Sequence, residues 1–244
     1  MSSAGAAGPP TTLALVPARG GSRTIPRKNI TPLAGRPLIA YALDAIRESG
    51  TADRTCVSTD DEEIAAVALE HGAEVPFLRP AALAHDETPA SAVVEHALDW
   101  LAAHEAFEPE CVLLVQPTEP FARPSHIRDA LDLMLARGAD SAITMVEVPR
   151  RFHPFHIRVL DEEGFLEFER PKEHYAHPAR QLDPPRYAFG NLYWFRRAAF
   201  LEHRQIEVGR RVGLLIDAVS SLDVDDSDDL ALAEALAERG LLPR

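Results

Sequence analysis

Residues 13–29 read LALVPARGGSRTIPRKN, a short apolar run that passes directly into glycines, hydroxyls and basic side chains. The run LALV is typical of a buried strand, and the change in composition marks its carboxyl end. Paired glycines let backbone N–H groups converge on an anion, and the hydroxyl and cationic side chains can bind phosphate. The stretch therefore predicts a triphosphate-binding turn directly after a first strand. It is neither a GxxxxGK[ST] loop nor a GxGxxG dinucleotide motif.

Apolar runs alternate with amphipathic stretches along most of the chain. The apolar runs are LALVPA (13–18), TCVST (55–59), CVLLVQ (111–116), SAITMVEV (141–148) and VGLLID (212–217), and the amphipathic stretches are 37–49, 61–72, 126–138 and 226–240. This alternation predicts a three-layer, Rossmann-like α/β fold with a mostly parallel, mixed sheet between helices. Such sheets bind ligands beyond the carboxyl ends of their strands, so the segments after LALV, CVST and CVLLV are expected at the site.

The alternation stops between residues 149 and 187, which are rich in Pro, His and charge and show no helical period. Within this stretch, PFHIRVLD and GFLEFER flank DEEG and predict a hairpin. His153 and His156 lack a third ligand at a zinc-like spacing, so they are expected on the surface or at a dimer contact. Because a long unstructured loop is unusual in a compact domain, we interpret 149–187 as an inserted, extended subdomain for dimerisation or for covering the site.

Length and composition define the domain organisation and restrict the partners. We expect a disordered tail, 1–12, and a single domain, 13–244, that carries the insertion. With 38 acidic and 25 basic residues the formal net charge is −13, which disfavours extended nucleic acid but permits a small phosphorylated ligand.

The cellular setting is also indicated by the sequence. Cys56 and Cys111 each open an apolar run, as expected of reduced core thiols. No stretch has the pattern of a secretion signal or a membrane span. These features predict a cytoplasmic protein that does not bind membranes.

Three groups of polar residues have more than one interpretation from pattern alone. Gln116 ends a buried strand, where a polar side chain implies a hydrogen-bonding role. Asp223 and Asp225 alternate in an extended segment and could bind one hard cation, but the acidic run that they begin also fits a helix N-cap. Arg180 and Gln181 could hold a substrate carboxylate or could be ordinary loop residues.

The run VPARGGSRTIPRKNI, residues 16–30, resembles the opening signature of the acylneuraminate cytidylyltransferases, which make CMP-sialic acids and related CMP-nonulosonic acids. The likeness continues in the family's order through STDD (58–61), PFLRPAALAHDET (76–88), QPT (116–118) and SLDVD (221–225). It covers nearly the whole chain after the tail. The resemblance implies a Rossmann-like nucleotidyltransferase that transfers CMP from CTP to an acidic acceptor, most simply a sialic-acid-like nonulosonic acid, and releases pyrophosphate.

The resemblance also implies roles for individual residues. The nucleotide-binding positions would be Arg19, Gly20, Gly21, Ser22, Lys28, Asn29, Arg79 and Ala84. The acceptor-binding positions would be Gln116, Arg180, Gln181, Phe189 and Asn191. Arg19, Lys28 and Asp223 would be catalytic, and the resemblance favours Asp223 and Asp225 as ligands of Mg²⁺ or Mn²⁺. A homodimer is expected as well.

One departure from the family pattern leaves the acceptor open. Phe189-Gly190-Asn191 precedes Tyr193 where the family usually shows an Asn-Gly pair. The acceptor could therefore be another nonulosonic acid or a smaller acid such as a phosphonate. Use of another base, as in a guanylyltransferase, and nucleotide binding without turnover are the remaining alternatives. The group that takes the acceptor's proton, a metal-bound hydroxide or an aspartate, also stays open.

Overall fold

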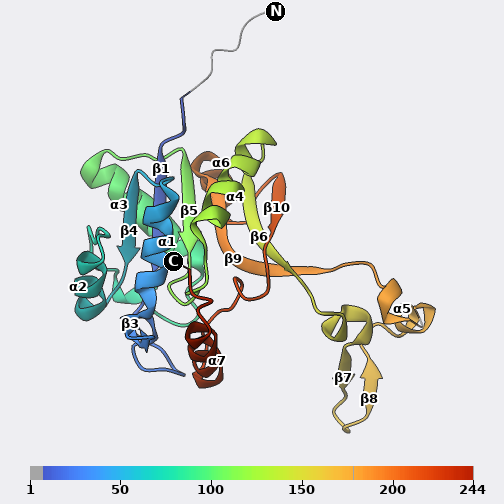
Figure 1. The fold of residues 1–244 in the computed structure, drawn as a ribbon. Coiled ribbons are helices and arrows are strands. Elements are labelled where there is room, and N and C mark those ends of the chain that lie inside the picture. Colours follow the sequence, from blue (N-terminus) through green and yellow to red (C-terminus); the bar gives the residue numbers. More distant parts are fainter. Residues whose placement is uncertain (1–7, 178, 244) are drawn as a thin grey trace, which may run out of the picture.

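A six-stranded sheet lies at the centre of the computed structural model, which describes residues 8–177 and 179–243 (Figure 1). Its spatial order is β10-β6-β9-β5-β1-β4. The strands are β1 (Thr12–Pro17), β4 (Arg54–Ser58), β5 (Cys111–Val115), β6 (Ser141–Glu147), β9 (Tyr187–Arg196) and β10 (Arg211–Leu215). β9 runs antiparallel to both of its neighbours, and the other five strands run parallel to one another. The predicted mostly parallel, mixed sheet is confirmed.

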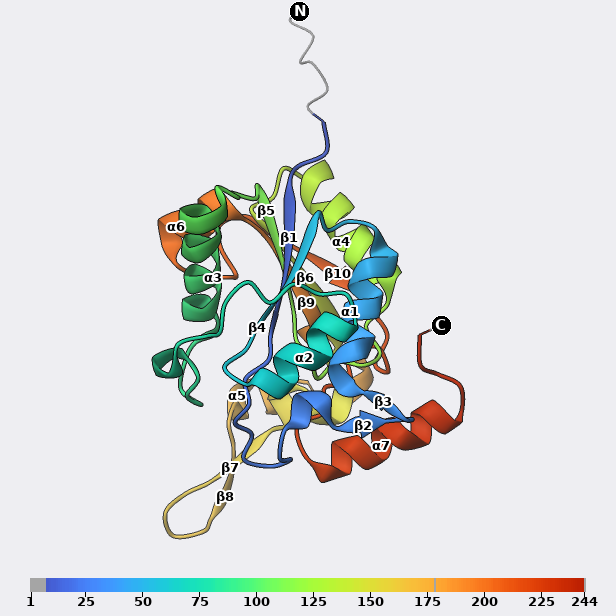
Figure 2. The same cartoon turned by 90° about the vertical axis from the view of Figure 1, so that its left-hand side faces the viewer.

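Helices cover both faces of this sheet, because successive side chains of a strand point to opposite faces. Ala14 and Val16 of β1 are buried on one face, and Leu13 and Leu15 on the other. The first face carries α1 (Leu38–Ser49), α2 (Glu62–Glu70) and α4 (Pro124–Ala136), and the second carries α3 (Ala90–Glu105) and α6 (Arg197–His203). Figure 2 shows the three layers, with α3 and α6 on one side of the sheet and α1 and α4 on the other. The three-layer architecture is also confirmed.

The C-terminal helix α7 (Ser227–Glu238) packs at the carboxyl ends of the strands, outside the two main layers. It shares an apolar cluster with the small hairpin of β2 (Pro32–Leu33) and β3 (Arg36–Pro37). Val224, just before α7, is fully buried in this cluster, and its N–H donates to the carbonyl of Thr118 at 2.9 Å. The segment around Val224 is therefore held against the segment that follows β5.

Strand β9 brings an irregularity into the sheet. Its pairing with β6 shifts register between Ile143 and Met145. At this bulge a Cβ atom on Gly190 would lie 2.8 Å from the backbone carbonyl carbon of Thr144, so only glycine fits there.

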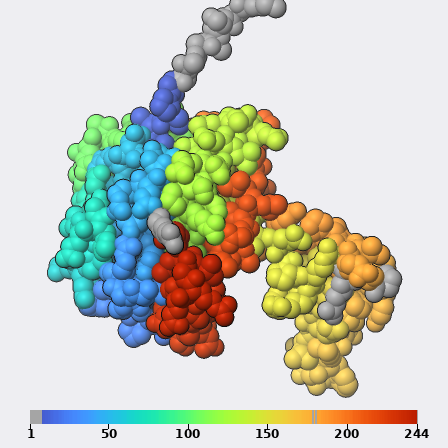
Figure 3. Space-filling model, viewed as in Figure 1, coloured from blue at the N-terminus to red at the C-terminus, as the bar shows by residue number. Residues whose placement is uncertain are grey.

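Residues 149–187 form a lobe that projects from the body, and we call this segment the arm (Figures 1 and 3). Its elements are η3 (Arg150–Phe152), η4 (Pro154–His156), β7 (Arg158–Leu160), β8 (Leu166–Phe168), α5 (Pro171–Ala176) and η5 (Arg180–Leu182). β7 and β8 pair antiparallel, which confirms the predicted hairpin. The side chain of Arg180 lies outside the described part of the chain.

The arm's histidines differ from the prediction. His153 and His156 are buried rather than exposed. His156 Nε2 lies 2.7 Å from a carboxylate oxygen of Asp183, and both side chains are almost inaccessible. His153 Nδ1 accepts the N–H of Phe155, so the ring holds the turn of η4. The expectation of a surface position was wrong because these rings satisfy polar groups inside the arm, whereas the alternative, a dimer contact, stays a prediction.

The predicted tail and core thiols can be compared with the described residues. β1 begins at Thr12, whose buried hydroxyl donates to Thr51 O at 2.6 Å, so the first strand starts one residue before the predicted boundary of the domain. Most of the predicted tail, residues 1–7, lies outside the described residues. Cys56 and Cys111 are buried and unpaired, as predicted. Within the described ranges, every helix is too short or too polar to cross a bilayer.

Candidate functional site

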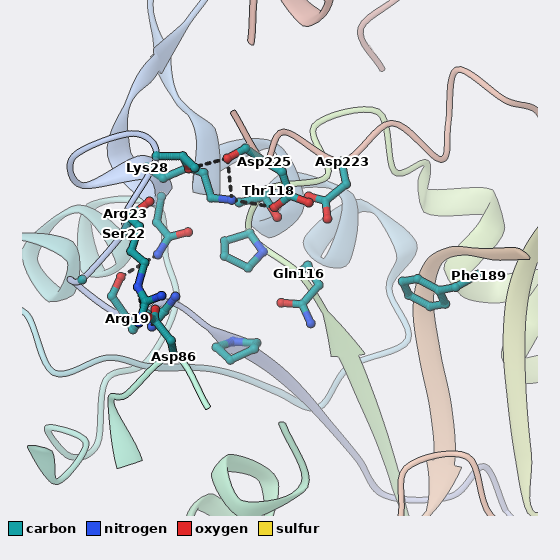
Figure 4. Close-up of a pocket in the computed structure, with 15 residues that line it drawn as sticks. Arg19, Ser22, Arg23, Lys28, Asp86, Gln116, Thr118, Phe189, Asp223 and Asp225 are labelled. Carbon is teal, nitrogen blue, oxygen red and sulfur yellow. Dashed lines mark hydrogen bonds and ion pairs between the residues drawn. The ribbon is translucent and has the colours of Figure 1, made fainter. Parts of the chain in front are cut away.

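A cavity of about 480 Å³ lies at the carboxyl ends of β1 and β5 (Figure 4). Its walls come from the segment after β1, from residues 116–118 after β5 and from the acidic segment before α7, with Asp86 and Phe189 at its sides. The cavity therefore lies at the carboxyl ends of two of the three strands after which the site was expected, β1 and β5. The segment after β4 does not line the cavity, but its Asp60 contacts the segment after β1.

Residues 19–29, which we call the glycine turn, are held by side chains from neighbouring segments. The N–H of Gly20 donates to Asp60 Oδ1 at 2.9 Å, and a Cβ atom on Gly20 would lie 2.8 Å from the side chain of Asp61. Asn29 is buried, and its Nδ2 donates to the carbonyl of Arg19 at 2.8 Å. Glycine at position 20 thus permits close packing on the segment after β4, and Gly21 is the glycine that lines the cavity.

The cations of the glycine turn are paired with acids from other segments. The carboxylate of Asp86 contacts the guanidinium groups of both Arg19 and Arg23. Lys28 Nζ lies 2.8 Å from Asp225 Oδ1. Figure 4 shows the two groups at one end of the cavity, with Ser22 between them and open space beside Gln116. Positive charge from one turn is thus concentrated where an anionic ligand would lie.

The acidic segment places Asp223 and Asp225 on the cavity side, because Val224 between them is buried on the opposite side. Both side chains therefore face the same space, as the alternating pattern predicts. Asp226 caps α7 by accepting the N–H groups of the first turn, which confirms the N-cap interpretation for the residues after Asp225.

The two aspartates have unequal environments. Burial is the main cause that raises the pKa of Asp223, with the carboxylate of Asp225 adding to it and a hydrogen bond from Thr118 opposing it. Oδ1 of Asp223 is buried and has no hydrogen-bond partner among the described residues. Asp225 is largely exposed and pairs with Lys28. An unpartnered buried carboxylate oxygen is costly without a proton or a cation.

The donor set fits a hard divalent cation of the Mg²⁺ type. Two carboxylates on one side of the cavity supply oxygen ligands, and Mg²⁺ usually keeps several waters and substrate phosphates as its other ligands. No group of three or more His, Cys, Asp or Glu side chains in the described ranges is arranged to hold a metal. A cation at this site would therefore need ligands from the substrate or from water.

A third carboxyl group lies close to the pair and was not predicted. Glu119 is 1% exposed, and its Oε2 has no hydrogen-bond partner within the described part of the chain. Its pKa is raised well above the ordinary value, first by burial and then by the carboxylates of Asp223 and Asp225. The signal was available in the sequence, since Glu119 follows QPT and precedes the apolar run PFA.

Besides Gly20, two other residues predicted to bind the nucleotide, Arg79 and Ala84, lie outside the cavity wall. Arg79 is buried, and its guanidinium donates to the hydroxyl of Ser58 at 3.0 Å and to the carbonyl of the same residue. Burial lowers the pKa of Arg79 to about 10. Ala84 ends the 3₁₀ turn η2 (Ala81–Leu83) on the loop before α3. In this structure Arg79 holds that loop to the end of β4.

Among the predicted acceptor residues, Gln116 and Phe189 line the cavity. Gln116 also lines a second hollow of about 410 Å³, whose other walls include Leu114, Tyr193 and Ile206. The rings of Phe189 and Tyr193 stack with centroids 4.3 Å apart and an interplanar angle of 11°. Gln116 and this aromatic pair therefore connect the two hollows.

The structure places the other predicted acceptor residues elsewhere. Asn191 is fully buried, its Oδ1 accepts from the hydroxyl of Thr144, and its Nδ2 donates to the carbonyl of Ser220. With both amide ends used inside the protein, Asn191 stabilises the β6–β9 bulge and does not face the cavity. Arg180 and Gln181 lie in η5 on the arm.

Comparison with known proteins agrees with this geometry. The family model for cytidylyltransferases matches residues 13–177. The CMP-N,N'-diacetyllegionaminic acid synthase of Legionella pneumophila is 34% identical over 93% of this chain and 96% of that protein. The pseudaminic acid cytidylyltransferase of Campylobacter jejuni is 29% identical over 92% of this chain and 95% of that protein.

A solved structure supports the fold independently. The CMP:2-keto-3-deoxy-manno-octonic acid synthetase complexed with CTP superimposes with a TM-score of 0.71, covering 94% of this chain and 99% of that chain. At 16% identity this likeness concerns the fold alone. The family model and the relatives show that the chain belongs to the cytidylyltransferase family.

Proposed function

We propose that this protein transfers CMP from CTP to a nonulosonic acid and releases pyrophosphate, with Mg²⁺ or Mn²⁺ as cofactor. The observation that carries the proposal is that one cavity is lined by the glycine turn with its Lys28, by Gln116 and by the Asp223–Asp225 pair. The relatives named for legionaminic and pseudaminic acids support a nonulosonic acceptor.

The reaction is an in-line displacement at the α-phosphorus of CTP. An acceptor hydroxyl oxygen forms the new bond to this phosphorus and gives its proton to a nearby base, for which Asp223 and Asp225 are the carboxylates in the cavity wall. The bond to the bridging oxygen breaks, and pyrophosphate leaves with the electron pair. The protein's part is positioning and charge neutralisation. Arg19, Ser22 and Lys28 bind the phosphates, and Gln116 orients the acceptor.

Asp223 and Asp225 would hold the divalent cation. When bound, the cation neutralises charge on the phosphates and so stabilises the transition state. Asp225 must then leave Lys28, with which it pairs at 2.8 Å. Lys28 would then be free to bind phosphate, and the carboxylate of Asp225 would be free to hold the cation.

The acceptor is proposed to lie across Gln116 between the two hollows. Its reacting hydroxyl would point to the phosphate end of the cavity, and its remaining atoms would extend past the stacked Phe189 and Tyr193 rings. A wall with an aromatic face and an amide suits a sugar acid, which offers both apolar and hydrogen-bonding edges.

The protein is further proposed to act as a cytoplasmic homodimer through the arm. Phe152, Leu160, Phe165, Leu166, Tyr175 and Leu182 are between 56% and 74% exposed there. Such a concentration of exposed apolar side chains on one lobe is typical of an interaction surface. Arg180 and Gln181 can serve an acceptor only if the arm of a second copy reaches the cavity. The free thiols of Cys56 and Cys111 suit a reducing compartment.

A substrate panel tests the reaction. The protein would be incubated with each of the four NTPs, Mg²⁺ or Mn²⁺ and a set of acids that includes sialic, legionaminic and pseudaminic acids and a phosphonate. Release of pyrophosphate is expected only with CTP, a divalent cation and a nonulosonic acid together. Turnover with GTP or with the phosphonate alone would contradict the proposal, and so would nucleotide binding without any turnover.

A further inference from the structure

One carboxylate bridges two cations of the glycine turn. Asp86 contacts Arg19 and Arg23, and all three side chains line the cavity. The side chain of Asp86 is 27% exposed and that of Arg19 33%, so their contact is partly shielded from water. The Arg19 guanidinium is the main cause that holds the pKa of Asp86 below its usual value, so the group is an anion at neutral pH.

This contact occupies hydrogen-bond donors that the proposed function assigns to phosphate. A guanidinium that is bonded to a carboxylate has fewer N–H groups available for a second anion. Asp86 also brings a like charge close to any phosphate bound at Arg19. Both effects oppose binding of the triphosphate and of pyrophosphate. Both would disappear if Asp86 moved away, and both would weaken if Asp86 lost its charge.

The position of Asp86 in the chain links its contact with Arg19 to the loop that precedes α3. Asp86 lies three residues after η2, on the loop that Arg79 holds to the end of β4. A phosphate group that takes Arg19 from Asp86 would therefore release the loop at its far end.

We propose that Asp86 is an internal competitor for the phosphate site: it binds Arg19 and Arg23 in the free enzyme, is displaced by the triphosphate, and returns to help expel pyrophosphate. The inference rests on the proposed function, because it takes the glycine turn as the phosphate site. No covalent step is involved, and the cost to nucleotide affinity is balanced by faster release of a highly charged product.

Calorimetric binding of inorganic pyrophosphate, without acceptor, tests the proposal directly. Asp86→Asn keeps the shape of the side chain and removes its charge, and it is expected to bind pyrophosphate about fivefold more tightly than the unaltered protein. Glu87→Gln removes the same charge from the next residue, which is exposed and makes no ion pair within the described ranges. Its affinity is expected to stay within twofold.

A double-mutant cycle separates competition from general repulsion. If Asp86 acts by occupying Arg19, the gain from Asp86→Asn should fall below twofold when Arg19→Gln is also present. A structure with pyrophosphate bound provides a readout without any variant at position 86, since Asp86 should then lie out of hydrogen-bond reach of Arg19. In turnover, inhibition by pyrophosphate should strengthen about fivefold in Asp86→Asn.

Three results would overturn the proposal. Unchanged or weaker pyrophosphate binding in Asp86→Asn would mean that Asp86 only positions the arginines, and equal tightening in Glu87→Gln would mean a general charge effect. These first two results leave the proposed function intact if CTP turnover is normal. Failure of the unaltered protein to bind pyrophosphate would instead reject the phosphate site itself, and with it both proposals. Asp86→Ser serves as a second variant if Asp86→Asn does not fold.

Discussion

The body and the arm distribute their side chains in opposite ways. The body buries its apolar residues in two large clusters on the faces of the sheet and collects its charged groups around one cavity. The arm exposes large apolar residues such as Phe165 and Leu166 and buries the polar pair His156–Asp183. The body therefore contains its own core and site, whereas the arm presents a surface that burial against another molecule would stabilise. Chemistry should depend on the body, and assembly on the arm.

The largest expected effect is on chemistry, from a change in the body. Asp223→Asn removes a carboxylate that we propose to bind the divalent cation, and kcat should fall at least 100-fold. The fold should not weaken, because burial raises the pKa of Asp223 and a neutral amide removes that unfavourable charge. Pyrophosphate release and thermal unfolding would measure the two effects.

The matched control for this change is Asp228→Asn. Asp228 lies in the first turn of α7, outside the cavity wall, so kcat should stay within twofold. Retention of most activity in Asp223→Asn would remove the aspartate from the catalytic assignment. A parallel loss in Asp228→Asn would mean that the charge of the whole segment matters more than its geometry.

The next largest effect should be on assembly, from a change in the arm. Leu166→Glu puts a charge on β8 in the exposed apolar surface and should weaken the proposed dimer about 30-fold or more. Leu69→Glu changes an equally apolar, exposed residue on α2 of the body and should leave assembly unchanged. Light scattering over a range of protein concentrations measures the fraction of dimer in the two variants. An unaltered protein that stays monomeric at high concentration would reject the dimer.

A smaller effect concerns the stability of the body as a function of pH. Burial and the neighbouring carboxylates raise the pKa of Glu119 well above 4.5 in the folded protein. The folded state thus binds this proton more tightly than the unfolded state does. The stabilisation is fully present below pH 4.5 and is lost as the pH rises through the raised pKa.

Glu119→Gln should remove this loss. The variant should gain on the order of 1–2 kcal/mol relative to the unaltered protein between pH 4.5 and pH 8, because no charge has to be buried. Urea unfolding at several pH values measures the difference, and Glu234→Gln on the exposed side of α7 is a control with no such trend. A constant difference across this range would show that Glu119 ionises as easily in the folded as in the unfolded state.

The sequence was sufficient for those parts of the fold that depend on local pattern. The strand and helix periods predicted the sheet, and the change in composition after Val16 predicted that the glycine turn follows the carboxyl end of the first strand. The alternation of Asp223 and Asp225 around Val224 correctly predicted that both face one side. These features are set by neighbouring residues, and local pattern is sufficient to read them.

Features that depend on distant contacts were missed. The antiparallel placement of β9 and the buried amide of Asn191 depend on Thr144 and Ser220, which are 47 and 29 residues away in the chain. Asn191 was assigned to the acceptor from the family resemblance, but both ends of its amide are used for hydrogen bonds at the bulge. Glu119 was missed in part for the same reason: its place between QPT and an apolar run was visible, but its closeness to Asp223 and Asp225 depends on a contact between distant segments.

The smallest expected effect concerns Phe189, which lies near the start of β9, just after the arm ends. Its ring lines the cavity and stacks on Tyr193, so Phe189→Asn should change recognition of the acceptor and leave CTP binding intact. We expect KM for the acceptor to rise about threefold to tenfold, as for the loss of one aromatic contact, with KM for CTP within twofold. Phe189→Leu is the informative partner: it keeps an apolar wall but not the stack, so an intermediate KM would assign the effect to the flat aromatic face. Equal changes in KM for the acceptor and KM for CTP would instead mean that Phe189 maintains the shape of the cavity and does not contact the acceptor.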